Sequence, residues 1–74
     1  MKLPRVTGEK VVKALQRKGF LLVHVKGSHH FLYHNDHDCL VTVPVHSGVV
    51  LAPKTLKSIL SQAHISVDEF VKMM

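Results

Sequence analysis

A short glycine turn, Lys26-Gly27-Ser28-His29-His30, separates two segments whose composition is typical of β-strands. The segments are Phe20 to Lys26 (FLLVHVK) and His29 to His34 (HHFLYH), which are rich in branched and aromatic residues and too short for a typical helix. Because strands joined by so short a link are usually neighbours in space, the pattern predicts an antiparallel hairpin. The hairpin would place two adjacent imidazoles, which exchange protons near neutral pH, at the head of a strand.

A third strand is predicted over Cys39 to Pro44 (CLVTVP), after the turn Asn35-Asp36-His37-Asp38. The three segments together predict an antiparallel meander, and Pro44 marks a strand end or an edge because it cannot donate to a ladder. An amphipathic helix precedes the strands. It is predicted from about Gly8 to Lys18, capped by Thr7 and ended by Gly19.

Two more helices are predicted after the strands. The first begins at Pro53 and carries an apolar side, and the second is opened by the capping-box sequence Ser66-Val67-Asp68-Glu69. No internal repeat or domain boundary interrupts residues 1–74, so we expect one domain. The order of helix, three strands, helix and short terminal helix predicts an α+β fold with helices packed on one face of an antiparallel sheet. The apolar side of the second helix consists of Leu56, Ile59, Leu60 and Ala63.

The facing of the first two strands follows from alternation. In the first strand, Leu21, Val23 and Val25 would point inward, with His24 and Lys26 outward, unless a bulge near Gly27 shifts the pattern. In the second strand, alternation groups His29 with Phe31 and Tyr33, the more apolar set, and His30 with Leu32 and His34. We therefore expect His29 at the rim of the core and His30 on the outward face.

The charge balance indicates an anionic partner. The 74 residues include 10 Lys and Arg against 5 Asp and Glu, a formal charge of +5, and Glu9 is the only acidic residue before the glycine turn. Nucleic acid is the first candidate, because neutralised phosphates supply most non-specific affinity; charge that only aids solubility is the alternative. The single Cys39 excludes an internal disulfide. With neither a secretory signal nor an apolar run of membrane-spanning length, we expect a cytoplasmic protein without membrane association. The basic residues before the turn are Lys2, Arg5, Lys10, Lys13, Arg17, Lys18 and Lys26.

The glycine turn contains groups that could assist RNA cleavage, although glycine turns beside a histidine are common. An imidazole at the strand head could remove a proton from a 2′-hydroxyl or donate one to the departing 5′-oxygen, help that is typically worth about 10²- to 10⁴-fold. Lys26 and the backbone and hydroxyl of Gly27-Ser28 could stabilise the charge that builds on the phosphate. His46, in the loop with Ser47-Gly48, could also reach a substrate. A hydrogen-bonded structural histidine would give the same pattern, and the residues alone favour that reading for His29.

A metal site is the third possibility, because histidine and cysteine are common zinc ligands. The spacing does not support it. Strand positions four apart lie roughly 13 Å from each other at about 3.3 Å per residue, and neither C-x-x-C nor H-E-x-x-H occurs. We expect no metal and no other cofactor. The residues considered are His24, His30, His34, His37, His46 and Cys39.

Taken together, four segments in order resemble the HicA (YcfA-like) mRNA interferase toxins of toxin–antitoxin pairs. The segments are VTGEKVVKALQRKGF, VKGSHHFLYH, VTVPVHSG, and TLKSILSQA followed by ISVDEF, which cover nearly the whole chain. The combination of the GSHH turn with VPVHSG is specific, whereas either alone would not be. Two departures from the family pattern affect helix ends. This chain has Pro53-Lys54-Thr55 where many relatives have a glycine before the threonine, and it has His64 where a glycine is expected.

The resemblance implies a double-stranded-RNA-binding-like fold and metal-independent cleavage of mRNA by one key histidine after the glycine turn, here His29. Some relatives carry their histidine at the position of His30, which is therefore the alternative. The resemblance also implies inhibition by a HicB-type antitoxin protein. Lys10, Lys13, Arg17 and Lys26 would gather the RNA backbone, with contacts from Gly27, Ser28 and His46. A non-catalytic RNA-binding module of the same fold is the alternative function.

Overall fold

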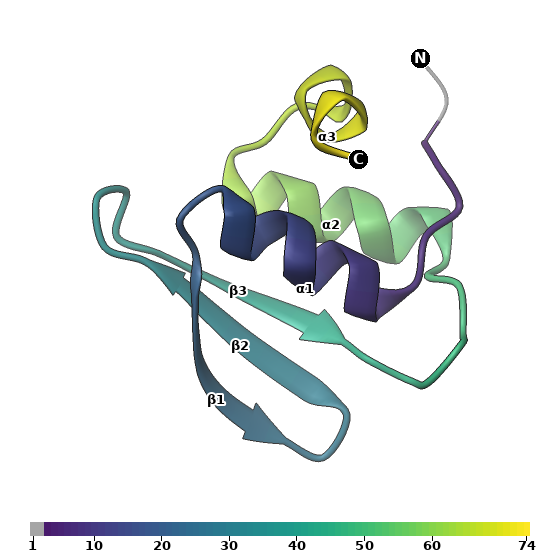
Figure 1. Cartoon of the computed structure of the whole chain (residues 1–74), viewed down its shortest axis with the longest axis horizontal. Helices are drawn as coiled ribbons and strands as arrows, with labels where there is room; N and C mark the ends of the chain where they lie inside the picture. Colours follow the sequence, from purple (N-terminus) through teal and green to yellow (C-terminus); the bar gives the residue numbers. More distant parts are fainter. Residues whose placement is uncertain (1–2) are drawn as a thin grey trace.

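Three helices and three strands follow one another in the predicted order in a computed structural model, which describes residues 3–74 (Figure 1). Lys2 of the basic set lies outside the described residues. The α+β class is confirmed, and most element bounds agree with prediction to within a residue. The elements are α1 (Gly8–Arg17), β1 (Leu21–Lys26), β2 (His29–His34), β3 (Cys39–Pro44), α2 (Pro53–Ala63) and α3 (Val67–Met73).

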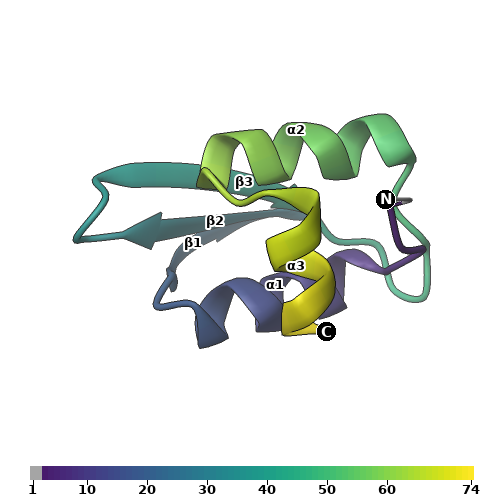
Figure 2. The same ribbon diagram turned by 90° about the horizontal axis from the view of Figure 1, so that it is seen from above.

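The strands form one antiparallel sheet in the order β1-β2-β3, and the helices lie on one side of it (Figures 1 and 2). Helices α1 and α2 pack on β3 and α1 also reaches β2, while α3 packs on α2 at the far side from the sheet. The core therefore lies between the sheet and the helices. Its fully buried side chains include Leu32, Val41 and Val43 of the sheet, Val11 and Leu15 of α1, Leu56 and Ile59 of α2, and Phe70 of α3.

The helix ends are those that local sequence signals predict. Thr7 caps α1 by accepting a hydrogen bond from the backbone N–H of Lys10 at 3.3 Å, and Ser66 caps α3 by accepting one from Glu69 at 3.1 Å. Pro53 is the first residue of α2. At the other end of α2, His64 adopts the left-handed conformation (φ 58°) that a glycine usually supplies.

The predicted facing of β1 is wrong. All six of its residues are exposed, including Leu21, Val23 and Val25, because β1 is an edge strand that α1 and α2 do not cover. A bulge is present, but it lies between Leu22 and His24 and not near Gly27. Since the bulge inserts Val23 without a partner, Leu22 pairs with Leu32 on the helix side and His24 pairs with Phe31 on the outer face.

The predicted facing of β2 is also reversed. Leu32 is fully buried and His34 is 9% exposed, so the set that includes His30 faces the helices, whereas His29 is exposed. The two aromatic residues that suggested a core face are half-buried on the outer face. There the ring of Phe31 lies 5.5 Å from that of His24, and the hydroxyl of Tyr33 donates to Asp38. Phe31 therefore packs against His24, and Tyr33 is held by Asp38, on the outer face and not in the core.

Candidate nucleic-acid interface

The glycine turn between β1 and β2 is a two-residue hairpin loop. Gly27 has φ +59° at the first loop position, a conformation that suits glycine, and an added Cβ there would meet nothing within 4 Å. The two residues that flank the loop, Lys26 and His29, are paired across the strands. Directly opposite residues share a face of the sheet, so the side chain of Lys26 and the exposed imidazole of His29 are neighbours on the outer face.

Three separate segments meet beside this turn. The backbone N–H of Val45, just after β3, donates to the carbonyl of Ser28 at 2.6 Å, and so joins the loop that contains His46 to the hairpin. The same loop is held from α1, because the backbone N–H of Gly48 donates to Oε1 of Glu9 at 3.3 Å. The start of α1, the hairpin turn and the loop after β3 therefore form one connected surface, with His46 exposed on it.

The two adjacent histidines face opposite sides of the sheet. His29 is exposed on the outer face, opposite Lys26. His30 is half-buried on the helix side, and its Nδ1 is buried without a hydrogen-bond partner. The imidazole of His30 borders a surface hollow, here called the His30 hollow, between α1, β1 and the residue after β3. The hollow is lined by Glu9, Val12, Lys13, Gln16, Leu22, His30 and Val45.

The basic residues predicted to gather RNA lie together on the outer face of α1. Lys10, Lys13 and Arg17 line a second shallow depression with Met74, and the guanidinium of Arg17 donates to the carbonyl of Met73 at 3.4 Å. Lys13 borders this depression and the His30 hollow alike. The basic face of α1 and the hairpin are therefore parts of one continuous surface, of which Lys13 is the shared residue.

Glu9, Gln16, Leu22 and Val45 were not among the predicted site residues. The spacing of Glu9, Lys13 and Gln16 along α1 does place them on one helical face, which is the only signal of the hollow that the sequence contains. The remaining walls depend on tertiary packing. Leu22 reaches the hollow through the bulge in β1, and Val45 through its hydrogen bond to Ser28.

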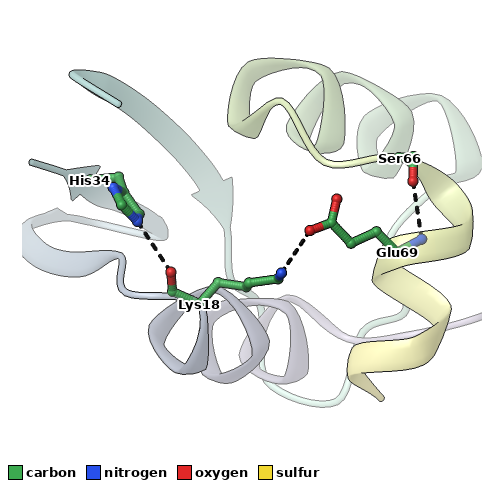
Figure 3. Close-up of polar contacts among 4 residues, drawn as sticks. All are labelled: Lys18, His34, Ser66 and Glu69. Carbon is green, nitrogen blue, oxygen red and sulfur yellow. Dashed lines mark hydrogen bonds and ion pairs between the residues drawn. The ribbon is translucent and has the colours of Figure 1, made fainter. Parts of the chain in front are cut away.

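His34, at the opposite end of the strands from the glycine turn, is a structural histidine (Figure 3). His34 Nε2 is 3.2 Å from the carbonyl oxygen of Lys18, and its ring packs at 5.0 Å from Phe20 and 4.5 Å from His37. The ammonium of Lys18 lies 2.6 Å from the carboxylate of Glu69, joining α1 to α3. This ion-paired hydrogen bond lowers the pKa of Glu69. His34 is thus a buried core histidine whose Nε2 has a hydrogen-bond partner and whose Nδ1 has none, while His24, His37 and His64 are exposed.

Within residues 3–74, His, Cys, Asp and Glu side chains do not gather in groups of three or more that could hold a metal ion. None of the helices in the described part of the chain is long and apolar enough to cross a membrane. The surface around α1 and the hairpin therefore combines three features. The cations of α1 lie beside the His30 hollow, which has polar and apolar walls, and the exposed imidazole of His29 lies on the other side of the same hairpin.

A protein-family model matches most of the chain. The model of a family described as the HicA toxin of bacterial toxin–antitoxin systems matches residues 8–65, from the first residue of α1 to the end of the turn after α2. The chain belongs to the HicA toxin family. The suspected resemblance is thereby confirmed, and with it a toxin role and a toxin–antitoxin partner. The matched range includes α1, the hairpin and the loop after β3, but not Met74, which borders the depression lined by Lys10, Lys13 and Arg17. No curated protein matches the chain.

Proposed function

We propose that this HicA-family toxin is a ribonuclease that cleaves mRNA without a metal ion, with His29 as the proton-transferring group. The observation that supports this most directly is that the basic face of α1 adjoins His30 through Lys13, at the strand head that also exposes His29, because a ribonuclease needs phosphate binding near a group that moves protons. Family membership supports the toxin role independently of this geometry. Action on mRNA would place the toxin in the cytoplasm.

In the proposed reaction, an RNA 2′-hydroxyl attacks the adjacent phosphorus and the bond from phosphorus to the 5′-oxygen breaks. The products are a 2′,3′-cyclic phosphate and a 5′-hydroxyl. His29 takes the 2′-hydroxyl proton or gives one to the departing oxygen, and it is exposed where an RNA backbone can reach it. Its cross-strand neighbour Lys26 and the N–H groups of the Gly27-Ser28 loop would stabilise the charge on the phosphate.

His30 is the alternative for proton transfer. It lies next to Lys13 and Glu9 in the hollow, where a carboxylate could orient an imidazole, but its half-buried ring gives a backbone phosphate less access than His29 has. The remaining proposed contacts follow the same surface. Lys10, Lys13 and Arg17 hold phosphates along α1, and His46 contacts RNA from the loop that is joined to Ser28.

The test compares three histidine-to-alanine variants on one hairpin. Purified wild-type protein and the variants His29→Ala, His30→Ala and His24→Ala are incubated with a long single-stranded RNA in EDTA. We expect His29→Ala to lose at least about 100-fold in rate, as for removal of a general acid or base, while its far-UV spectrum and melting temperature stay unchanged. The matched control His24→Ala, which alters an exposed imidazole on the neighbouring strand, should cut at the wild-type rate.

The outcomes separate the alternatives. If His29→Ala cuts normally and His30→Ala does not, His30 is the proton-transferring residue. If wild-type protein retards the RNA on a gel but leaves it intact, the chain is an RNA-binding module without catalysis. For the partner, we propose a HicB-type antitoxin, and co-expression with the neighbouring open reading frame should relieve growth arrest. Persistent arrest with a well-expressed neighbour would contradict that assignment.

A further inference from the structure

The His30 hollow has the mixed character of a site for a small, flat, polar group. Val12, Leu22 and Val45 supply apolar walls, and the half-buried imidazole of His30 supplies an aromatic ring. Sites for small ligands commonly combine such walls with a few placed polar groups. The Nδ1 of His30 is buried without a hydrogen-bond partner, as is the Nδ1 of His34 in the core.

The polar groups of the hollow come from α1 and are positioned by it. Glu9, Lys13 and Gln16 lie on one face of this helix, so their spacing is rigid. The Glu9 carboxylate is further oriented because its Oε1 accepts a hydrogen bond from Gly48 at 3.3 Å. Each carboxylate oxygen has two lone pairs, so Oε1 keeps one acceptor position and Oε2 keeps two for a ligand. The hollow thus presents an acceptor from Glu9, a donor from Lys13, and both from the Gln16 amide.

We propose that the His30 hollow binds an unpaired guanine base of the RNA, next to the phosphate that is cut. This inference rests on the proposed ribonuclease function and names its base specificity. Proteins recognise single-stranded RNA by stacking a splayed base on an aromatic ring and by hydrogen-bonding its Watson–Crick edge. Guanine alone presents two adjacent N–H donors, N1 and N2, which a carboxylate such as Glu9 accepts, beside an O6 acceptor for Lys13.

The chain path places this base beside the proposed chemistry. His30, which borders the hollow, directly follows His29, and the two side chains face opposite sides of the sheet. An RNA backbone that crosses the Gly27-Ser28 loop would insert one base into the hollow and present the next phosphate to His29. The loop allows this close passage, since no side chain is present at Gly27.

The test measures binding without cleavage. Fluorescence anisotropy is recorded with labelled 2′-O-methyl pentanucleotides, UUGUU, UUAUU, UUCUU and UUUUU, which lack the 2′-hydroxyl that the reaction needs. We expect wild-type protein to bind UUGUU about 10-fold more tightly than the others, within the range of one good bidentate base contact. Glu9→Gln replaces an acceptor oxygen with a donor but can still accept from Gly48, so it should reduce the preference for guanine to less than about twofold.

The control variant is Lys57→Ala, which removes an exposed cation from α2, away from the hollow, and should retain the guanine preference. Equal binding of the four oligonucleotides by wild-type protein, or an unchanged preference in Glu9→Gln, would overturn the guanine site alone. Failure to bind any of the four would overturn the proposed function as well. Mapping of cut sites in a long RNA gives a second readout: cuts by wild-type protein should lie beside guanines, and cuts by Glu9→Gln should lose that bias.

Discussion

Replacing Gly8 with alanine should destabilise the protein, although alanine is the better helix former. Gly8 is the first residue of α1 and is buried against the end of β3. A Cβ built on it would lie 2.3 Å from the carbonyl oxygen of Pro44 and 3.1 Å from Cα of Val45. Both contacts are with backbone atoms, so no side-chain rotation can relieve them and α1 itself must move away from the sheet.

The magnitude follows from two opposing terms. Helix propensity favours alanine over glycine by at most about 1 kcal/mol, whereas an overpacked contact costs about 1–3 kcal/mol. Because the 2.3 Å approach is to a backbone atom, the overpacking cost should lie in the upper part of this range, at about 2–3 kcal/mol. We therefore expect Gly8→Ala to lower the free energy of unfolding by about 1–2 kcal/mol. In a domain of this size each kcal/mol corresponds to about 4–8 °C in melting temperature.

The assay is urea unfolding followed by far-UV circular dichroism, with Gln16→Ala as the control. Gln16 is exposed on the same helix, so its replacement should change the free energy of unfolding by less than about 0.5 kcal/mol. The slope of the unfolding curve should stay constant for both variants, which would show that stability and not the unfolded state has changed. A Gly8→Ala protein as stable as wild type, or more stable, would refute the close approach of α1 to β3.

Two further predictions concern single side chains. Because the Lys18 ammonium lowers the pKa of Glu69 in the folded state, Glu69→Gln should be less stable than wild type at neutral pH. The difference should disappear as the pH falls below the ordinary carboxyl value of 4.5 and through the lowered one. Urea unfolding at neutral and acidic pH checks this, and an equal difference at both would contradict it. Burial, with a smaller effect of Asp38, raises the pKa of the Cys39 thiol, so a disulfide reagent at neutral pH should label native protein slowly and unfolded protein at once. Rapid labelling of native protein would show that Cys39 is accessible.

Element order and helix ends could be predicted because their signals are local. The Thr7 and Ser66 caps, the initial Pro53 and the turn at Gly27 each act through neighbours in the chain, and each lies where it was expected. His64 shows the limit of such signals. It adopts the left-handed conformation without being glycine, so α2 ends there although the sequence lacks the residue that usually marks a helix end.

The facing of the strands could not be predicted because it depends on which strand the helices cover. Phe31 and Tyr33 are aromatic residues of the kind expected in a core, yet they lie on the outer face because α1 and α2 cover the side that holds Leu32. The same packing decides the surroundings of His29 and His30. Alternation correctly predicts that they face opposite sides, but only the position of the helices determines which of the two meets solvent.

The bulge at Val23 determines which residue of β1 reaches the candidate site. Without an extra residue, the two-residue loop would place Leu22 opposite Tyr33, on the outer face. With Val23 unpaired, Leu22 lies opposite Leu32 and becomes a wall of the His30 hollow. The residues between the bulge and the loop keep the simple hairpin register, so Lys26 remains opposite His29. The inserted residue therefore adds Leu22 to the inner face beside His30, while Lys26 and His29 remain on the outer face.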